Sequence, residues 1–121
     1  MAKKKILIID DDVSLCDELS EILSGEGYSV NAASDTENAQ RFIRKNSYDL
    51  YILDYKMQGM TGIDLLKIIK EQRSACPVLL ITGRPAIESL LEAENLSGAV
   101  AGILNKPFNI EELLYKIRNL S

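Results

Sequence analysis

The chain has 121 residues, of which 46% are apolar and 26% charged, and its formal net charge is −4. This length fits one domain that can bury a core without disulfides or metal ions, so we expect a single domain over residues 1–121. The mild acidity excludes a general electrostatic attraction to nucleic acid or to an anionic membrane. Histidine is absent, which excludes histidine-based catalysis and histidine metal ligands.

Hydropathy and the two cysteines indicate the cellular compartment of the protein. No apolar stretch approaches the roughly 18 residues that span a bilayer. Cys16 and Cys76 lack a Cys-x-x-Cys spacing, which favours reduced thiols packed as small core residues. We therefore expect a cytoplasmic protein.

Five short apolar runs predict β-strands. In chain order they are Lys5–Asp10, Tyr28–Ala33, Asp49–Asp54, Pro77–Thr82 and Val100–Leu104. Three of them contain almost continuous apolar stretches (ILII, LYIL and VLLI), a pattern typical of strands buried on both faces of a parallel sheet. The run Tyr28–Ala33 alternates instead, which predicts an edge strand.

Five amphipathic stretches between and after these runs predict helices. Their apolar positions recur at helical spacing, as at Leu15, Leu19, Ile22 and Leu23 in the first, which we expect to end at Gly25 and Gly27. Ser34 with Glu37 predicts a capping box for the second helix. The remaining signals are Thr61 as a cap, then Ile87, Leu90 and Leu91 in the fourth helix, and Asn109 as the cap of the fifth.

Strict alternation of strands and helices predicts a doubly wound α/β fold, with a five-stranded parallel sheet between helices. In such folds ligands bind beyond the carboxyl ends of the strands, where the winding reverses. The residues at these ends are Asp10-Asp11-Asp12, Asp54, Thr82-Gly83 and Asn105-Lys106-Pro107.

The acids at these strand ends predict a cation site. A single acid would serve as a helix cap, but three consecutive acids plus Asp54 repel one another unless a cation compensates. An all-oxygen set of this kind favours Mg²⁺ or Mn²⁺.

Beside such a cation, Asp54 is a candidate nucleophile toward phosphorus, because carboxylates form acyl-phosphates. Lys106 supplies a positive charge for a phosphoryl oxygen, and Thr82 supplies a hydrogen bond. Gly83 leaves room for an incoming group. Positioning and charge neutralisation are most of what phosphoryl transfer requires from a protein.

These motifs resemble the receiver domain of bacterial two-component response regulators over essentially the whole chain. The resemblance rests on residues 6–12 (ILIIDDD), residues 49–62 (DLYILDYKMQGMTG), residues 80–83 (LITG) and residues 105–108 (NKPF). It implies the flavodoxin-like (βα)5 fold and a phosphorelay role in signal transduction, in which Asp54 becomes a 4-aspartylphosphate.

The resemblance also implies roles for individual residues. Asp54 is similar to the aspartate that accepts a phosphoryl group from a histidine kinase. Asp11 resembles the acid that binds Mg²⁺ directly, Asp10 the acid that acts through water, and the backbone carbonyl of Lys56 completes the protein ligands. Thr82 resembles the switch hydroxyl and Lys106 the family lysine, with a cis bond to Pro107.

Further implications concern lifetime and partners. Lys56 and Arg84 lie two residues beyond Asp54 and Thr82, where they would tune the lifetime of the phosphoryl group. The resemblance places the partner surface on the fourth helix, fifth strand and fifth helix. It implies a sensor histidine kinase or phosphotransfer protein as donor, and no direct contact with nucleic acid or membrane. It also implies a protein that assists only its own phosphorylation and dephosphorylation rather than an enzyme.

Three positions depart from the family pattern. Ile103 stands three residues before Lys106, where the family usually has Tyr or Phe, so the usual aromatic rotamer switch cannot operate. Gln58 replaces the usual proline in the turn after Asp54, which predicts a less rigid loop. The stretch between Thr82 and Lys106 is slightly longer than usual.

Three alternatives stay open from the sequence. A phosphatase of the haloacid dehalogenase type needs a second acid two residues after its nucleophile, where this chain has Lys56. A flavodoxin-like binding module needs a phosphate loop after the first strand, where three acids would repel phosphate. A pseudo-receiver that only binds partners would not need the complete set of acceptor, acids, threonine and lysine.

Overall fold

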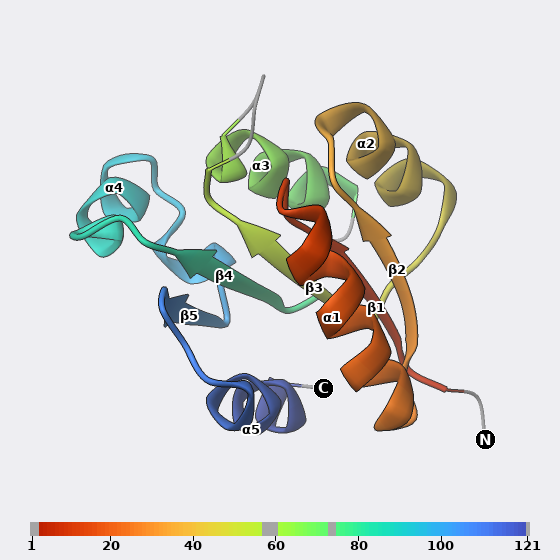
Figure 1. Ribbon diagram of the computed structural model, residues 1–121. Helices are drawn as coiled ribbons and strands as arrows, with labels where there is room; N and C mark the ends of the chain where they lie inside the picture. Colours follow the sequence, from red (N-terminus) through yellow and green to blue (C-terminus); the bar gives the residue numbers. More distant parts are fainter. Residues whose placement is uncertain (1–2, 57–60, 73–74, 121) are drawn as a thin grey trace.

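The computed structural model describes residues 3–56, 61–72 and 75–120, and Figure 1 shows its strands gathered into one sheet. The strands are β1 (Lys5–Ile9), β2 (Ser29–Ala33), β3 (Leu50–Asp54), β4 (Val78–Thr82) and β5 (Gly102–Asn105). The helices are α1 (Val13–Gly25), α2 (Thr36–Lys45), α3 (Gly62–Gln72), α4 (Ile87–Ala93) and α5 (Ile110–Leu120), with a 3₁₀ turn at Ser97–Ala99.

The sheet is parallel throughout, with the strand order β2-β1-β3-β4-β5. The chain winds outward from β1 to β2 and then returns past β1 to β3. The winding therefore reverses between β1 and β3, whose carboxyl ends carry Asp10 and Asp54. This confirms the predicted doubly wound fold and puts the expected ligand position between these two residues.

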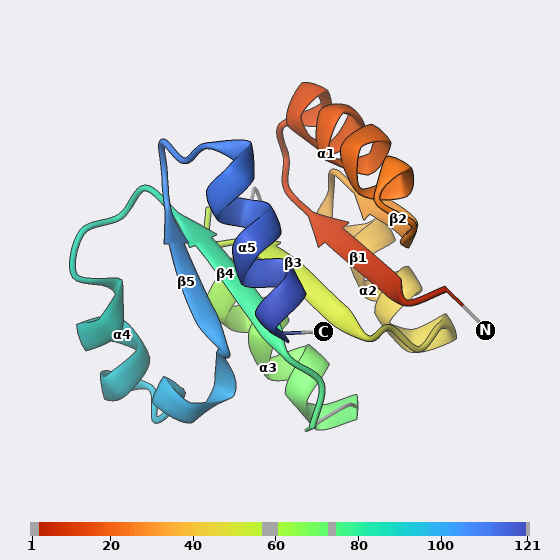
Figure 2. The same ribbon diagram turned by 90° about the horizontal axis from the view of Figure 1, so that it is seen from below.

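Helices cover both faces of the sheet, and each face has its own core. Figure 2 shows α1 and α5 on one face, with α2 and α3 on the other. The core under α1 and α5 contains Ile6, Ile8, Leu50 and Ile52, whereas Leu7, Ile9, Tyr51 and Leu53 face α2 and α3. β3 and β4 are buried along their whole length, while β2 alternates between exposed and half-buried residues up to a buried Ala33, as predicted for an edge strand.

Most predicted helix ends are confirmed. The α1 helix ends at Gly25, and Gly27 takes a left-handed φ of 99° that stops it. Asn109 Oδ1 accepts a hydrogen bond from the Glu112 N–H at 2.7 Å and caps α5. Before α3, Thr61 Oγ1 accepts from the Asp64 N–H at 3.3 Å while Asp64 Oδ2 accepts from the Thr61 N–H at 3.1 Å.

The predicted capping box of the second helix is wrong. The N-cap of α2 is Asp35 rather than Ser34, and its Oδ1 accepts a hydrogen bond from the Asn38 N–H at 2.7 Å. Asp35 accepts a second bond from the Asn38 side chain at 2.9 Å. Two acceptor oxygens on one short side chain outcompete a serine hydroxyl one position earlier, so the helix starts at Thr36.

Both cysteines are free thiols, as expected. Cys16 is buried and Cys76 half-buried, and the Cys16 thiol donates to the carbonyl oxygen of Asp10 at 3.1 Å. Within the described ranges, no helix combines the length and apolarity that crossing a membrane requires.

Candidate functional site

Three polar residues are buried within the described part of the chain, and all three lie at the carboxyl edge of the sheet. Asp10 is 2% exposed, Asp54 4% and Thr82 1%. Asp10 follows β1, Asp54 ends β3 and Thr82 ends β4, so three parallel strands bring them to the same edge. Buried polar groups of this kind require partners or a function.

Lys106 joins the two buried carboxylates. Its Nζ lies 3.2 Å from Asp54 Oδ1 and 3.4 Å from Asp10 Oδ2, and its side chain is one-third exposed. Asp10 Oδ1 also accepts a hydrogen bond from the Asp12 N–H at 3.0 Å. One ammonium group, placed just after the carboxyl end of β5, thus contacts both carboxylates.

The electrostatics of this cluster leave excess negative charge. Burial, followed by the nearby Asp10 carboxylate, raises the pKa of Asp54 to about 6 despite the opposing Lys106 charge. Burial also raises the pKa of Asp10, against the Asp12 N–H and Lys106. Burial lowers the pKa of Lys106, but Asp10 and Asp54 together outweigh burial and raise that pKa. Further positive charge would therefore stabilise the ionised carboxylates.

The donor set fits a hard divalent cation. Asp10, Asp11 and Asp54 each offer a carboxylate oxygen, and these oxygens lie within 4.8 Å of one another. Asp11 is exposed and reaches this group from the start of the loop after β1. Three oxygen donors with room for water are the chemistry that Mg²⁺ or Mn²⁺ uses.

The third acid of the triplet has a structural role. Asp12 is the N-cap of α1, and its Oδ1 accepts a hydrogen bond from the Leu15 N–H at 3.1 Å. The structure therefore divides the acid triplet into two members of the carboxylate cluster and one helix cap.

Thr82 lines a cleft of about 570 Å³ beside the end of β3. The cleft is lined by Tyr55, Lys56, Thr61, Thr82, Gly83 and Arg84. Thr82 Oγ1 accepts a hydrogen bond from the Arg84 N–H at 2.9 Å. A Cβ atom added to Gly83 would have Lys106 Cβ at 3.8 Å as its nearest neighbour, so this residue leaves open space next to the lysine.

Of the remaining predicted positions, Ile103 packs against the core and Lys56 lines the cleft beside Thr82. Ile103 pairs with Leu80 across β4 and β5 and packs, half-buried, against the core under α2 and α3. Gln58 lies outside the described residues. Lys56 is exposed and forms an isolated bridge with Thr61. The Lys106–Pro107 peptide bond is cis, as the resemblance implies.

Two residues that sequence reasoning gave no role are part of this architecture. A Cβ on Gly62 would lie 2.6 Å from Tyr55 Cα and 2.7 Å from the Asp54 carbonyl oxygen, so α3 begins in direct contact with the backbone at the end of β3. A glycine just inside a capped, buried helix start is the signal that could have identified it. The other residue is Tyr55, whose ring lies 5.5 Å from the Arg84 guanidinium carbon.

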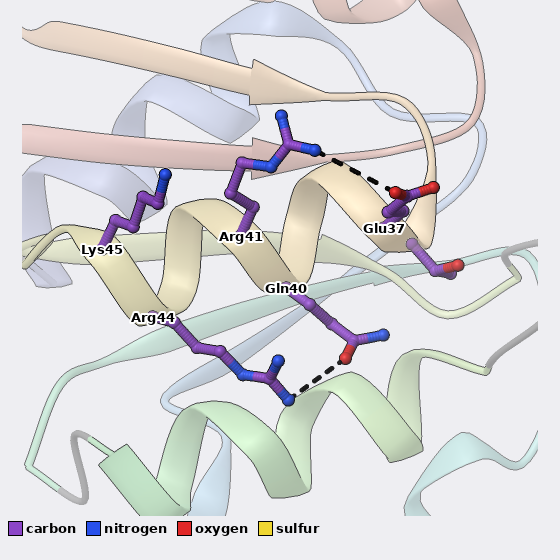
Figure 3. Close-up of a pocket in the computed structure, with 6 residues that line it drawn as sticks. Glu37, Gln40, Arg41, Arg44 and Lys45 are labelled. Atoms are coloured by element: carbon purple, nitrogen blue, oxygen red, sulfur yellow. Dashed lines mark hydrogen bonds and ion pairs between the residues drawn. The ribbon is translucent and has the colours of Figure 1, made fainter.

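A second hollow lies on the outer surface of α2. Figure 3 shows its side chains spread along the helix rather than converging on one point. Arg41 approaches Glu37 at 4.0 Å, and Arg44 donates to Gln40 at 3.4 Å. Such spacing is typical of a solvated helix surface.

Comparisons with known proteins agree with this geometry. A family model described as the response regulator receiver domain matches residues 6–118. The probable transcriptional regulatory protein TcrX of Mycobacterium tuberculosis is 31% identical over 118 residues, covering 95% of this chain and 48% of TcrX. The transcriptional regulatory protein ZraR of Escherichia coli K12 is 37% identical over 108 residues, covering 89% of this chain and 24% of ZraR.

Solved structures show the same fold. A CheY-like receiver domain from Methanospirillum hungatei aligns with a TM-score of 0.89 at 30% identity, covering 98% of this chain and 93% of that one. The response regulator protein TrrA from Thermotoga maritima, solved in complex with Mg²⁺–BeF, aligns with a TM-score of 0.82 at 30% identity, covering 98% and 99%.

The chain thus spans less than half the length of the two transcriptional regulators that it matches. The family match covers nearly all of the described fold, from β1 into α5. This protein belongs to the response regulator receiver domain family of two-component signalling systems.

Proposed function

We propose that Asp54 accepts a phosphoryl group from the phosphohistidine of a sensor histidine kinase or phosphotransfer protein, with Mg²⁺ held at the same site. The observation that carries this proposal is the buried Asp54 carboxylate, 3.2 Å from Lys106 Nζ and grouped with Asp10 and Asp11. A carboxylate that only stabilised the fold would not need two more acids beside it.

Each residue has a defined task in this proposal. Asp10, Asp11, Asp54 and the Lys56 carbonyl hold the cation, which neutralises charge on the transferring group when bound. Asp54 attacks phosphorus, the P–N bond to the donor histidine breaks, and the electron pair returns to the imidazole nitrogen. Lys106 stabilises the phosphoryl oxygens, and the Thr82 hydroxyl then moves to donate a hydrogen bond to the new phosphate.

Loss of the phosphoryl group follows by hydrolysis. A water attacks the phosphorus and the bond to Asp54 breaks, which restores the carboxylate and releases phosphate. Lys56 and Arg84 line the cleft through which that water approaches and tune the lifetime. The protein acts on itself in both steps and turns over no separate substrate.

The output is carried by the face that α4, β5 and α5 form. On this face Tyr115 is 68% exposed, beside a shallow cleft of about 260 Å³ that includes Ala101, Gly102 and Lys116. Similar proteins are named as transcriptional regulators and are at least twice as long as this chain. We propose that this face contacts an output domain or a partner protein.

The test is chemical phosphorylation followed by intact-mass measurement. With acetyl phosphate and Mg²⁺ the wild-type protein should gain the mass of one phosphoryl group, and with a chelator it should gain none. Asp54→Asn should remain unlabelled under every condition.

The matched control is Asp49→Asn, which changes the acid that begins the same apolar run at its other end. Asp49 accepts a hydrogen bond from the Lys5 N–H at 2.7 Å, which asparagine can also accept. This variant should be labelled like the wild type. Labelling of Asp54→Asn, or none in the wild type, would overturn the proposal.

A further inference from the structure

Tyr55 and Arg84 form a contact across the mouth of the cleft. Tyr55 directly follows the acceptor Asp54, and Arg84 comes two residues after Thr82. The Arg84 guanidinium carbon lies 5.5 Å from the centre of the Tyr55 ring, within the range of a cation–π interaction. Tyr55 itself is half-buried against the core under α2 and α3, so its ring is fixed while Arg84 is exposed.

The backbone of Arg84 holds the switch hydroxyl. The Arg84 N–H donates to Thr82 Oγ1 at 2.9 Å. If this oxygen moves toward a phosphoryl group on Asp54, that hydrogen bond must break or the backbone of Arg84 must move with it. Thr82 therefore keeps this hydrogen bond on moving only if Arg84 moves as well.

The segment that contains Arg84 has few restraints of its own. Ala86 takes a left-handed φ of 60°, which is unfavourable for alanine, and α4 begins there without a side-chain cap. Contacts from outside the segment therefore contribute much of what holds it in place. The Tyr55 ring provides one such contact.

The usual aromatic partner of the hydroxyl is missing. Position 103 carries isoleucine, which packs in the core. Of the described residues that line the cleft beside Thr82, the aromatic one is Tyr55.

We propose that Tyr55 is a positioning residue that, through its stack on Arg84, holds the segment 82–86 in the unphosphorylated arrangement. This inference rests on the proposed phosphoryl acceptance at Asp54. Formation of the phosphate draws Thr82 inward, and the hydrogen bond from the Arg84 N–H to Thr82 Oγ1 draws the backbone of Arg84 with it, which separates the guanidinium from the ring. The stack thus forms only in the unphosphorylated arrangement, and its loss favours the phosphorylated one.

The consequence is a measurable change in affinity. An exposed cation–π contact contributes enough to change an equilibrium roughly two- to fivefold. Removing it should tighten the binding of a phosphoryl mimic by that factor, because the mimic no longer breaks the contact. A residue with a merely structural role would weaken binding when substituted.

The experiment is calorimetric titration of beryllofluoride into the Mg²⁺-loaded full chain. Tyr55→Leu, which keeps an apolar side chain in the core, should bind about two- to fivefold more tightly than the wild type. Tyr55→Phe keeps the ring and should bind beryllofluoride with the wild-type affinity. Tyr28→Leu is the control, because it replaces a half-buried tyrosine just before β2, at the opposite edge of the sheet. This variant should also bind beryllofluoride with the wild-type affinity.

A double-mutant cycle separates the stack from the direct effect of the arginine charge on the anion. In an Arg84→Met background, Tyr55→Leu should no longer change the affinity. Urea denaturation of each variant identifies any that fails to fold, and Tyr55→Trp provides a second readout in a chain that has no tryptophan. The emission of that tryptophan should change when beryllofluoride is added.

The outcomes distinguish the two proposals. If the wild-type protein does not bind beryllofluoride with Mg²⁺, the proposed function itself fails. If it binds, but Tyr55→Leu binds equally or more weakly, or its effect persists in the Arg84→Met background, the positioning role is overturned while phosphoryl acceptance stands. An unchanged Tyr55→Trp emission would count against the positioning role in the same way.

Discussion

Asp10 and Asp54 are two buried carboxylates that share one ammonium group, and this shortage of positive charge defines the site. Lys106 contacts both, yet burial and mutual repulsion still raise the pKa of Asp54 to about 6. Such an arrangement is costly to the metal-free fold and favourable to a bound cation. The same two carboxylates therefore lower the stability of the metal-free protein and favour cation binding.

This opposition predicts a pH dependence of stability. Because the pKa of Asp54 is raised in the folded protein, the native state binds more protons than the unfolded chain between about pH 4 and pH 6. The contribution of Asp54 to the free energy of unfolding should thus fall as pH rises through this window. In urea denaturation without metal, the free energy of unfolding of Asp54→Asn should be higher than that of the wild type at pH 7, by on the order of 1 to 3 kcal/mol. Near pH 4 the two free energies should be equal.

One result would contradict this pH dependence. A constant difference between the two proteins from pH 4 to pH 7 would mean that Asp54 does not titrate in this range. Asp49→Asn serves as control and should show no such trend relative to the wild type.

Asp11 and Asp12 are neighbours with separate roles. Asp12 caps α1, so Asp12→Ala should lower the free energy of unfolding by about 1 kcal/mol and leave Mg²⁺ affinity nearly unchanged. Asp11→Ala should weaken Mg²⁺ binding more than about tenfold and leave metal-free stability nearly unchanged. Calorimetric Mg²⁺ titration and urea denaturation of both variants would test this; the reverse pattern would refute the assignment.

At the scale of residues, the sequence predicts which residues gather at the site better than it predicts the contacts between their side chains. The strand-end rule is enough to bring Asp10, Asp54, Thr82 and Lys106 together, because the ends of parallel strands share an edge. The stack of Arg84 on Tyr55 depends on side-chain rotamers and on the path of the β4–α4 connection, which no pattern of residue types specifies.

At the scale of elements, α3 is fixed to the acceptor strand by an approach that only glycine permits. The Gly62 N–H donates to the Tyr55 carbonyl oxygen at 2.5 Å, and the missing side chain allows the helix to touch the Asp54 backbone. The start of α3 is therefore part of the framework that positions Asp54.

Gly62→Ala should consequently destabilise the protein by about 1 to 3 kcal/mol, because the new methyl group forces α3 away from β3. The same shift should slow phosphorylation by acetyl phosphate. Gly25→Ala is the matched control: a Cβ there meets nothing within 4 Å, and it lies at the end of α1 without a left-handed φ. Gly25→Ala should be neutral or slightly stabilising, and an equally mild effect of Gly62→Ala would argue against the close approach.

Element types were predictable, but their ends were less so. One acid and two hydroxyls, at Ser34, Asp35 and Thr36, are candidate caps for α2, and backbone geometry makes Asp35 the cap. The fifth strand begins at Gly102 rather than Val100, and two residues separate it from a 3₁₀ turn at Ser97–Ala99. Local residue preference alone does not reveal that turn.

For the whole molecule, the sheet order follows from alternation and chirality. Once five buried runs alternate with helices, right-handed crossovers leave few ways to cover both faces. The alternating pattern of Tyr28–Ala33 then identifies one edge, as found for β2.

Metal binding should stabilise this whole unit. A cation that binds only the folded state raises the free energy of unfolding by about 2.7 kcal/mol at a concentration a hundred times its Kd. Urea denaturation with and without Mg²⁺ should show this increase in the wild type at neutral pH. Asp11→Ala should show little of it, and an equal increase in that variant would place the cation elsewhere.

The most direct test of the account is to locate the phosphoryl group. After phosphorylation with acetyl phosphate and Mg²⁺, borohydride reduction converts an aspartyl phosphate to homoserine, which peptide mass spectrometry can assign to one residue. The account predicts homoserine at position 54 in the wild type and in Asp49→Asn. Reduction at another aspartate, or a base-stable phosphate on a hydroxyl such as that of Thr82, would contradict it.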